Sequence, residues 1–139
     1  MRVDARVDAY VPAEYIGSEA LKIDLHRRLA LAENDDELRE LHASIEDRYG
    51  DVPEPVENLF RIQDVKLKLA TLGADYLVYR GGRATVGPLV LGSAELRALR
   101  DVTDTAVYTS ARREVSQRTE ALAGAIGLVD AIVVARQAA

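Results

Sequence analysis

The chain has 139 residues, of which 48% are hydrophobic and 29% charged, which is typical of one globular domain with a hydrophobic core. Its formal net charge of −5 argues against a large surface that follows nucleic-acid phosphates, because free nucleic-acid binders are usually basic. The absence of cysteine excludes disulfides, thiolate metal sites and a cysteine nucleophile, and it fits a reducing compartment.

The chain shows no targeting or membrane-spanning pattern. The first ten residues, MRVDARVDAY, lack the apolar core of a secretory signal peptide. The longest apolar stretch, residues 121–135, contains Asp130 and two glycines and is short for a bilayer-spanning helix. We therefore expect a cytoplasmic protein without a membrane contact.

The first elements predicted are an edge strand and a helix. Residues 2–9 alternate between apolar and charged side chains, which predicts a short, half-buried strand that ends before Pro12. Ser18 predicts the N-cap of a first helix, on which Asp24 and Arg28 are spaced to form an ion pair. The apolar residues of this helix recur nearly every fourth position: Leu21, Leu25, Leu29 and Ala32.

The clearest helix signal lies in residues 34–55, NDDELRELHASIEDRYGDVPEP. Asn34 predicts the N-cap, and Glu37 is placed to return the hydrogen bond as in a capping box. Gly50 predicts the end of the helix in a positive-φ conformation, and the prolines that follow prevent its continuation. The predicted buried face repeats at a 3-4-4 spacing: Leu38, Leu41, Ile45 and Tyr49.

A third helix is predicted over residues 55–72 and ends at Gly73. Glu57 is expected to pair with Arg61 on its exposed side, and Asp64 with Lys68. Its predicted buried face contains Val56, Leu59, Phe60, Ile62, Val65, Leu69 and Leu72.

Two hairpin–helix units follow. Strands over 75–80 and 83–87 flank Gly81-Gly82, a hairpin-turn signal, and an extension of the second strand over 89–91 stays open. A short helix capped by Ser93, a weaker hairpin over 105–109 and 113–117, and a last helix from about Thr119 complete the pattern. The inward residues are expected to be Leu96, Leu99 and Val102 on the short helix, and Leu122, Ile126, Val129, Ile132 and Val133 on the last.

The predicted fold class is therefore α+β in a single domain of residues 1–139. An N-terminal strand and a three-helix segment precede two ββα-like units, whose strands form a small, mostly antiparallel sheet.

No residue pattern in the chain indicates catalysis, a cofactor or a metal. His26 and His42 have no second ligand at helical spacing, and no phosphate-binding loop, dinucleotide fingerprint or nucleophile elbow occurs. Residues 80–83, Arg-Gly-Gly-Arg, could form an anion-binding nest, but a tight hairpin turn with solvated arginines is the favoured interpretation.

One charged cluster stands at the end of the second helix. Glu46 and Asp47 place negative charge where the helix dipole disfavours it, whereas Arg48 is favourable there. Two interpretations stay open: a solvated surface, or a polar contact that orients a partner.

Three segments, in order, resemble the C-terminal domain of the bacterial transcription-repair coupling factor (Mfd). The family pattern has an AYIP-x-x-Y-like opening, a helix ending in RRLA, and a helix ending in Asp-Arg-[Phe/Tyr]-Gly before Pro-x-Pro. The matching segments are DAYVPAEYI (8–16), LKIDLHRRLA (21–30) and DELRELHASIEDRYGDVPEPVENL (36–59). Beyond Gly73 the resemblance is one of architecture and length.

The resemblance implies that this chain is one module of an ATP-dependent DNA translocase, a helicase-like hydrolase that acts on double-stranded DNA. That parent removes stalled RNA polymerase and recruits nucleotide-excision repair, with its ATP and Mg held outside this segment. The domain itself is expected to be non-catalytic, without a cofactor, and regulatory. It docks on the UvrB-like module of the same chain, masks the UvrA-binding surface and keeps the resting protein autoinhibited.

The resemblance also implies the contact residues. In the family, an acidic residue followed by x-x-Asp-Arg lies at the interdomain contact. Asp47 and Arg48 match that pattern, Ser44 stands at its first acidic position, and Glu46 is nearby but points elsewhere on a helix. The alternative functions are an accessory module that binds nucleic acid or RNA polymerase, and an enzyme of unrecognised class.

Overall fold

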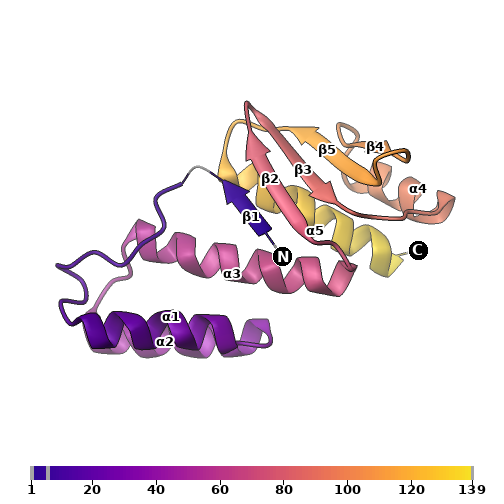
Figure 1. The fold of residues 1–139 in the computed structure, drawn as a ribbon. Helices are drawn as coiled ribbons and strands as arrows, with labels where there is room; N and C mark the ends of the chain where they lie inside the picture. Colours follow the sequence, from indigo (N-terminus) through magenta and orange to yellow (C-terminus); the bar gives the residue numbers. More distant parts are fainter. Residues whose placement is uncertain (1, 6, 139) are drawn as a thin grey trace. The chain divides into compact units, whose positions relative to one another are not determined.

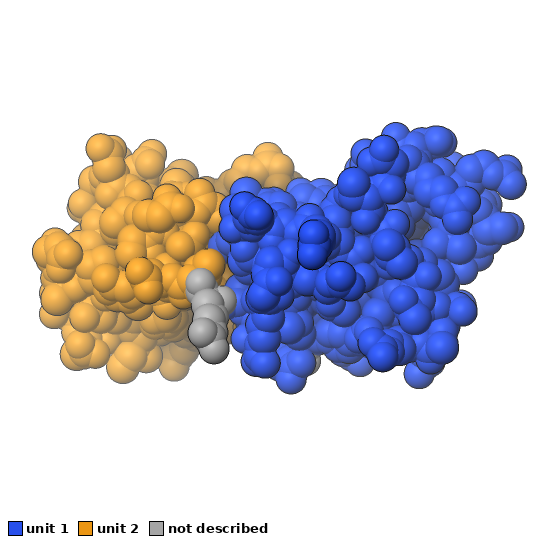
Figure 2. Space-filling model, turned by 90° about the horizontal axis from the view of Figure 1, so that it is seen from above, with its two compact units in different colours: residues 1–6, 68–139 blue, residues 7–67 orange. Residues whose placement is uncertain are grey.

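The computed structural model describes residues 2–5 and 7–138, which form five helices and one five-stranded sheet (Figure 1). The chain divides into two compact units, residues 7–67 and residues 1–6 with 68–139 (Figure 2). We call these the helical unit and the sheet unit. The expectation that the whole chain forms one domain stays a prediction.

The helical unit contains α1 (Glu19–Leu31), α2 (Asp35–Tyr49) and residues 54–67 of α3 (Glu54–Leu72). Both predicted N-caps are confirmed: Ser18 Oγ accepts from Leu21 N–H at 3.3 Å, and Asn34 Oδ1 from Glu37 N–H at 2.9 Å. The capping box was wrong in its second bond, because the Glu37 carboxylate accepts from Glu33 N–H at 2.7 Å rather than from Asn34.

The core of the helical unit is made of apolar faces from all three helices and from the segment before α1. The expected pair of Asp24 and Arg28 on α1 is confirmed at 2.9 Å. Leu41 and Tyr49, predicted on the buried face of α2, pack at the margin of the core and stay partly exposed. The buried members are Val11, Ile16, Leu25, Leu29, Ala32, Leu38, Ile45, Val56 and Phe60.

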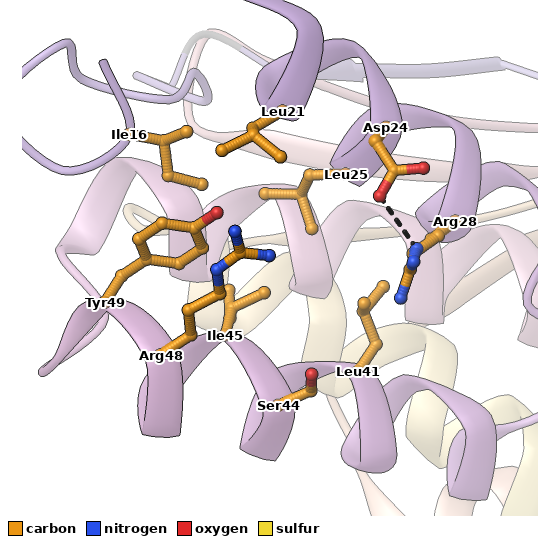
Figure 3. A pocket seen from close by; sticks show the side chains of 10 residues that line it. All are labelled: Ile16, Leu21, Asp24, Leu25, Arg28, Leu41, Ser44, Ile45, Arg48 and Tyr49. Carbon is orange, nitrogen blue, oxygen red and sulfur yellow. Dashed lines mark ion pairs between the residues drawn. The ribbon is translucent and has the colours of Figure 1, made fainter. Parts of the chain in front are cut away.

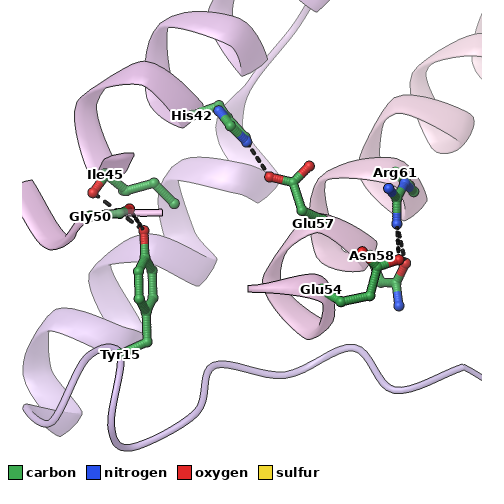
Figure 4. A network of polar contacts seen from close by, with 8 residues as sticks. All are labelled: Tyr15, His42, Ile45, Gly50, Glu54, Glu57, Asn58 and Arg61. Atoms are coloured by element: carbon green, nitrogen blue, oxygen red, sulfur yellow. Dashed lines mark hydrogen bonds and ion pairs between the residues drawn. The ribbon is translucent and has the colours of Figure 1, made fainter. Parts of the chain in front are cut away.

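Polar contacts join α2 to α3 within this unit (Figure 4). The expected pair of Glu57 and Arg61 is wrong, because Glu57 contacts His42 of α2 while Arg61 turns back to Glu54 and Asn58, each at 2.7 Å. Asn58 is a buried polar residue, and its amide Nδ2 donates to the Asp8 carbonyl at 2.9 Å. This bond ties the segment before α1 to α3 and satisfies the buried amide.

The sheet unit contains strands in the order β1-β2-β3-β5-β4, with β1 parallel to β2 and the other pairs antiparallel. The predicted α+β class is thereby confirmed. The strands are β1 (Arg2–Ala5), β2 (Tyr76–Arg80), β3 (Arg83–Gly87), β4 (Val107–Thr109) and β5 (Glu114–Arg118). This unit also contains residues 68–72 of α3 and two further helices, α4 (Ser93–Val102) and α5 (Leu122–Ala138).

The structure shortens the first predicted strand. β1 lies at a sheet edge, as expected, but it ends at Ala5, and residues 7–9 lie outside any strand; Arg6 lies outside the described residues. The partner of Ala5 is Tyr79, and β2 turns back at Gly81, so the ladder has no partner for residues 7–9. Residues 89–91 also form no strand, because they follow the Gly87-Pro88 break.

The helices of the sheet unit differ from prediction in which residues they bury. Gly92, not Ser93, is the N-cap of α4, and Val102 at its end is 48% exposed. On α5, Leu122, Ile126 and Val133 are only partly buried. The face that α5 buries is richer in alanine: Ala125, Leu128, Val129, Ala131, Ile132 and Ala135. Small residues allow a helix to approach its neighbours closely, a preference that apolar periodicity alone does not show.

One face of the sheet contains fully buried side chains, and the other, which we call the outer face, is largely partly exposed. Leu77, Ala84, Val86 and Val115 are fully buried, and α5 lies along their side of the sheet (Figure 1). The alternate residues belong to the outer face, because successive strand residues point to opposite sides. These include Arg2, Asp4, Tyr76, Val78, Arg80, Arg83, Thr85, Gly87, Glu114, Ser116 and Arg118.

On the outer face, Tyr76 reaches across β3. Its strand partner is Gly87, and its hydroxyl donates to Glu114 Oε2 of β5 at 2.5 Å. A Cβ atom at Gly87 would lie 2.6 Å from the Tyr76 hydroxyl and 3.0 Å from the Arg113 carbonyl. Gly87 therefore leaves the space through which the tyrosine side chain passes.

We expect Gly87→Ala to destabilise the sheet unit by about 1–3 kcal/mol, because the added methyl group overlaps the Tyr76 side chain. Gly127→Ala in α5 is the matched control, since a Cβ there meets nothing within 4 Å. It should stabilise the chain by about 0.5–1 kcal/mol through helix propensity. Denaturant unfolding measures both, and equal effects of the two variants would contradict the packing argument.

We also expect an alkaline loss of stability that depends on Tyr76. Burial and the hydrogen bond to Glu114 raise its pKa from 10.0 to about 12. The unfolded chain therefore ionises first, so this contribution is fully present below pH 10 and is lost as the pH rises towards 12. Unfolding measured across that window should depend less on pH in Tyr76→Phe. An unchanged slope in this variant would contradict the assignment.

Candidate interdomain contact at the end of helix α2

The four residues predicted as a contact lie on the last two turns of α2, and all are exposed: Ser44, Glu46, Asp47 and Arg48. At about 100° per residue, Ser44, Asp47 and Arg48 lie on one side of the helix and Glu46 on the other. The structure therefore brings three of them together on one side of α2 and turns the fourth away.

Ser44 and Arg48 line a groove between α1 and α2 (Figure 3). Its volume is about 50 Å³, far smaller than the several hundred Å³ of a small-molecule site. Asp24 and Arg28 of α1 lie opposite, joined by their ion pair. The remaining lining is apolar or aromatic: Ile16, Leu21, Leu25, Leu41, Ile45 and Tyr49. This groove has the size of one side chain of a partner, and a wider, more open depression of about 440 Å³ shares Arg28, Leu41 and Ser44 with it.

Three charged side chains stand at this helix end: Glu46, Asp47 and Arg48. None of them forms an ion pair within the described part of the chain. The guanidinium carbon of Arg48 lies 5.2 Å from the centre of the Tyr49 ring, a cation–π contact that leaves its N–H donors free for a carboxylate. Glu46 and Asp47 stay unfavourable at the helix C-terminus, and among the described residues neither forms an ion pair that would offset this.

Tyr15 fixes the backbone at this helix end (Figure 4). Its hydroxyl donates to the Gly50 carbonyl at 2.9 Å and lies 3.4 Å from the Ile45 carbonyl, while its ring lies 5.8 Å from that of Tyr49. Burial raises the pKa of Tyr15, and nearby carboxylates, Glu46 first among them, raise it further. The phenol therefore stays a donor through the physiological pH range. Gly50 adopts φ 90°, as its predicted place at the helix end requires.

Sequence reasoning missed Tyr15 as a positioning residue. It belongs to the DAYVPAEYI segment, but its partners, Gly50 and Ile45, are 35 and 30 residues away in the sequence. A tyrosine that bonds a distant turn carries no local pattern. Only the joint presence of the aromatic residue and the Gly50 turn in one motif could have indicated the contact.

The other candidate sites take ordinary structural positions. His26 is exposed on α1, and His42 contacts Glu57 and stacks edge-on against Phe60 with the ring centres 5.1 Å apart. Gly81 and Gly82 have φ of 56° and 73°, which confirms the hairpin-turn interpretation of residues 80–83. Within residues 2–5 and 7–138, no cluster of three or more His, Cys, Asp or Glu could hold a metal ion.

The helices within the described ranges include none that is both long and apolar enough to cross a membrane.

Several known proteins are similar in sequence to this chain. Transcription-repair-coupling factors are 34% identical over 102 residues in Mycobacterium tuberculosis, 33% over 81 in Staphylococcus epidermidis and 36% over 73 in Helicobacter pylori. These matches cover 72%, 58% and 52% of this chain, but only 8%, 7% and 7% of the relatives. The chain thus spans less than about a tenth of the length of these relatives.

A solved structure shares the fold. The crystal structure of the C-terminal domain of transcription-repair coupling factor matches with a TM-score of 0.82 and 21% sequence identity, over 98% of this chain and 93% of that one. The match therefore extends over α4, β4, β5 and α5, where the sequence resemblance was one of architecture alone.

The family model of the TRCF domain matches residues 5–87, which is more than half of the chain. This range includes α1, α2 and α3 with the candidate contact, and it continues through the β2–β3 hairpin. The chain therefore belongs to the TRCF domain family, and its fold is that of the C-terminal domain of transcription-repair coupling factor.

Proposed function

We propose that this chain is a non-catalytic, regulatory domain of a cytoplasmic transcription-repair coupling factor. Through the end of α2, it docks on the UvrB-like module of the same parent protein. There it covers the surface that binds UvrA. Docking keeps the resting protein autoinhibited. The parent uses ATP and Mg to translocate on double-stranded DNA, to remove stalled RNA polymerase and to recruit nucleotide-excision repair.

The observation that carries this proposal is the pair of unpartnered charges on one side of a rigid helix end. Asp47 and Arg48 are exposed, opposite in sign and adjacent, and neither has an ion pair among the residues described. Tyr15 holds the backbone beneath them through Gly50. A preorganised pair of opposite charges favours one orientation of a partner that carries the complementary pair.

The chemistry of the contact suits a lock that opens. Contacts between domains that separate are smaller and more polar than permanent interfaces, and charged rims contribute orientation more than affinity. Ser44 stands where the family pattern has an acid, so the contact contains one negative charge fewer. Its orientation then depends on Asp47 and Arg48, with the Ser44 hydroxyl as a neutral hydrogen-bonding neighbour in the groove.

The test is a titration of the 139-residue chain against the separate UvrB-like module. Asp47→Ala with Arg48→Ala should weaken binding at least about tenfold, since a lost charge-assisted hydrogen bond costs about 1.5–3 kcal/mol. Unfolding stability should change by less than about 0.5 kcal/mol, because both residues are exposed. UvrA should displace the chain from the module.

The matched control is Asp36→Ala with Arg39→Ala, which removes the same charges from the other end of α2 and should leave docking unchanged. Titration into the millimolar range covers the effective concentration that a short tether provides. An unchanged affinity of the Asp47 and Arg48 double variant for the module would contradict the assignment of these residues to the docking contact. Binding that UvrA does not displace would contradict the masking mechanism.

A further inference from the structure

The net charge of the chain is divided unevenly between the two units. Residues 7–67 contain 7 Lys and Arg against 15 Asp and Glu, a formal charge of −8. Residues 1–6 and 68–139 contain 11 Lys and Arg against 8 Asp and Glu, a formal charge of +3. The overall acidity is therefore a property of the helical unit, and it does not exclude a nucleic-acid surface on the sheet unit.

Three arginines lie side by side at one end of the sheet, and we call them the arginine row. Arg80 of β2 is the register partner of Arg83 of β3, and Arg83 is the partner of Arg118 of β5. Figure 1 shows the β2–β3 turn and the end of β5 at the same end of the sheet. Directly opposed residues share a sheet face, so all three side chains leave the outer face, and all three residues are exposed.

This arrangement is locally unfavourable, because like charges directly opposite each other on neighbouring strands destabilise a sheet. Asp4 compensates Arg80 at 2.5 Å. Arg83 and Arg118 have no ion-pair partner among residues 2–5 and 7–138. Two adjacent cations are therefore left without compensation, which a bound anion would provide.

The backbone beneath the row is fixed. The three strands are joined by their ladders, and Thr119 N–H donates to the Gly82 carbonyl at 2.9 Å, which ties the chain after Arg118 to the hairpin turn. The Cα atoms of the three arginines are consequently held in a fixed line. An anion with repeated charges would meet them with little cost in backbone ordering.

Hydroxyl side chains stand next to the arginine row. Next to the row, Thr85 of β3 is the partner of Ser116 of β5, so two hydroxyl groups share the outer face with the arginines. Guanidinium groups and hydroxyls are the usual donors to the nucleic-acid backbone. Tyr76, the aromatic residue of this face, is held over Gly87 by its bond to Glu114, so it offers no free ring for an unpaired base.

We propose that the arginine row binds the phosphate backbone of a DNA duplex without reading its sequence. A duplex presents the repeated negative charges that a line of guanidinium groups matches, and it requires no stacking side chain. This surface belongs to the sheet unit and uses none of the residues of the proposed docking contact. The two proposals can therefore be tested independently.

The experiment measures binding of the 139-residue chain to a fluorescently labelled DNA duplex of mixed sequence, between about 50 and 200 mM salt. The two uncompensated arginines, Arg83 and Arg118, predict that log K falls with log salt at a slope of about −2. Arg83→Gln with Arg118→Gln should weaken binding and bring the slope close to zero, because Arg80 is already paired with Asp4. A single-stranded DNA of the same length should bind no more tightly than the duplex.

The matched control is Arg97→Gln with Arg100→Gln, which removes the same charge from exposed positions of α4 in the same unit. Its slope should stay at the wild-type value, and circular dichroism should show all variants folded. Equal losses in both double variants, or no duplex binding at low salt, would overturn the proposal. Displacement of the duplex by a polyglutamate peptide of equal charge would also overturn the proposal, because the arginine row would then bind an acidic protein segment.

Discussion

The hydrogen bond from the Tyr15 hydroxyl to the Gly50 carbonyl is the constraint on which the candidate contact depends. It joins the segment before α1 to the turn after α2, and it reaches the carbonyl of a glycine whose φ of 90° few other residues adopt. With that turn held, the backbone of Asp47 and Arg48 has a fixed position, and Arg48 lines the groove between α1 and α2. A polar contact gains orientation only if its charges are held in this way.

The two units differ in how much their sequences reveal. In the helical unit each helix has a cap residue or a single apolar face, so Ser18, Asn34 and Gly50 were enough to predict α1 and α2. In the sheet unit α5 is apolar on nearly every side, and the alanines that it buries were hidden among larger residues. Periodicity predicts a helix there but cannot choose its face, because tertiary packing makes that choice.

The candidate sites show the same limit. Asp47 and Arg48 were found from a local motif, since both lie on one helix turn. The groove beside them needs α1, and the Tyr15 bond needs a residue 35 positions from Gly50. The arginine row needs strand order: a turn brings Arg83 to Arg80, but only the pairing of β3 with β5 brings Arg118 to Arg83. Contacts over long sequence separations leave no periodic trace.

The passage of Tyr76 over Gly87 has a consequence for how this family can vary. A side chain at position 87 requires either that the Tyr76 side chain move or that a smaller residue stand at position 76, because the observed positions overlap. The two positions should therefore change together among family members. Position 114 is free to vary more, since any side chain of similar length with a hydrogen-bond acceptor can accept from the Tyr76 hydroxyl. Covariation confined to the tyrosine and the glycine would thus mark a steric dependence rather than a functional one.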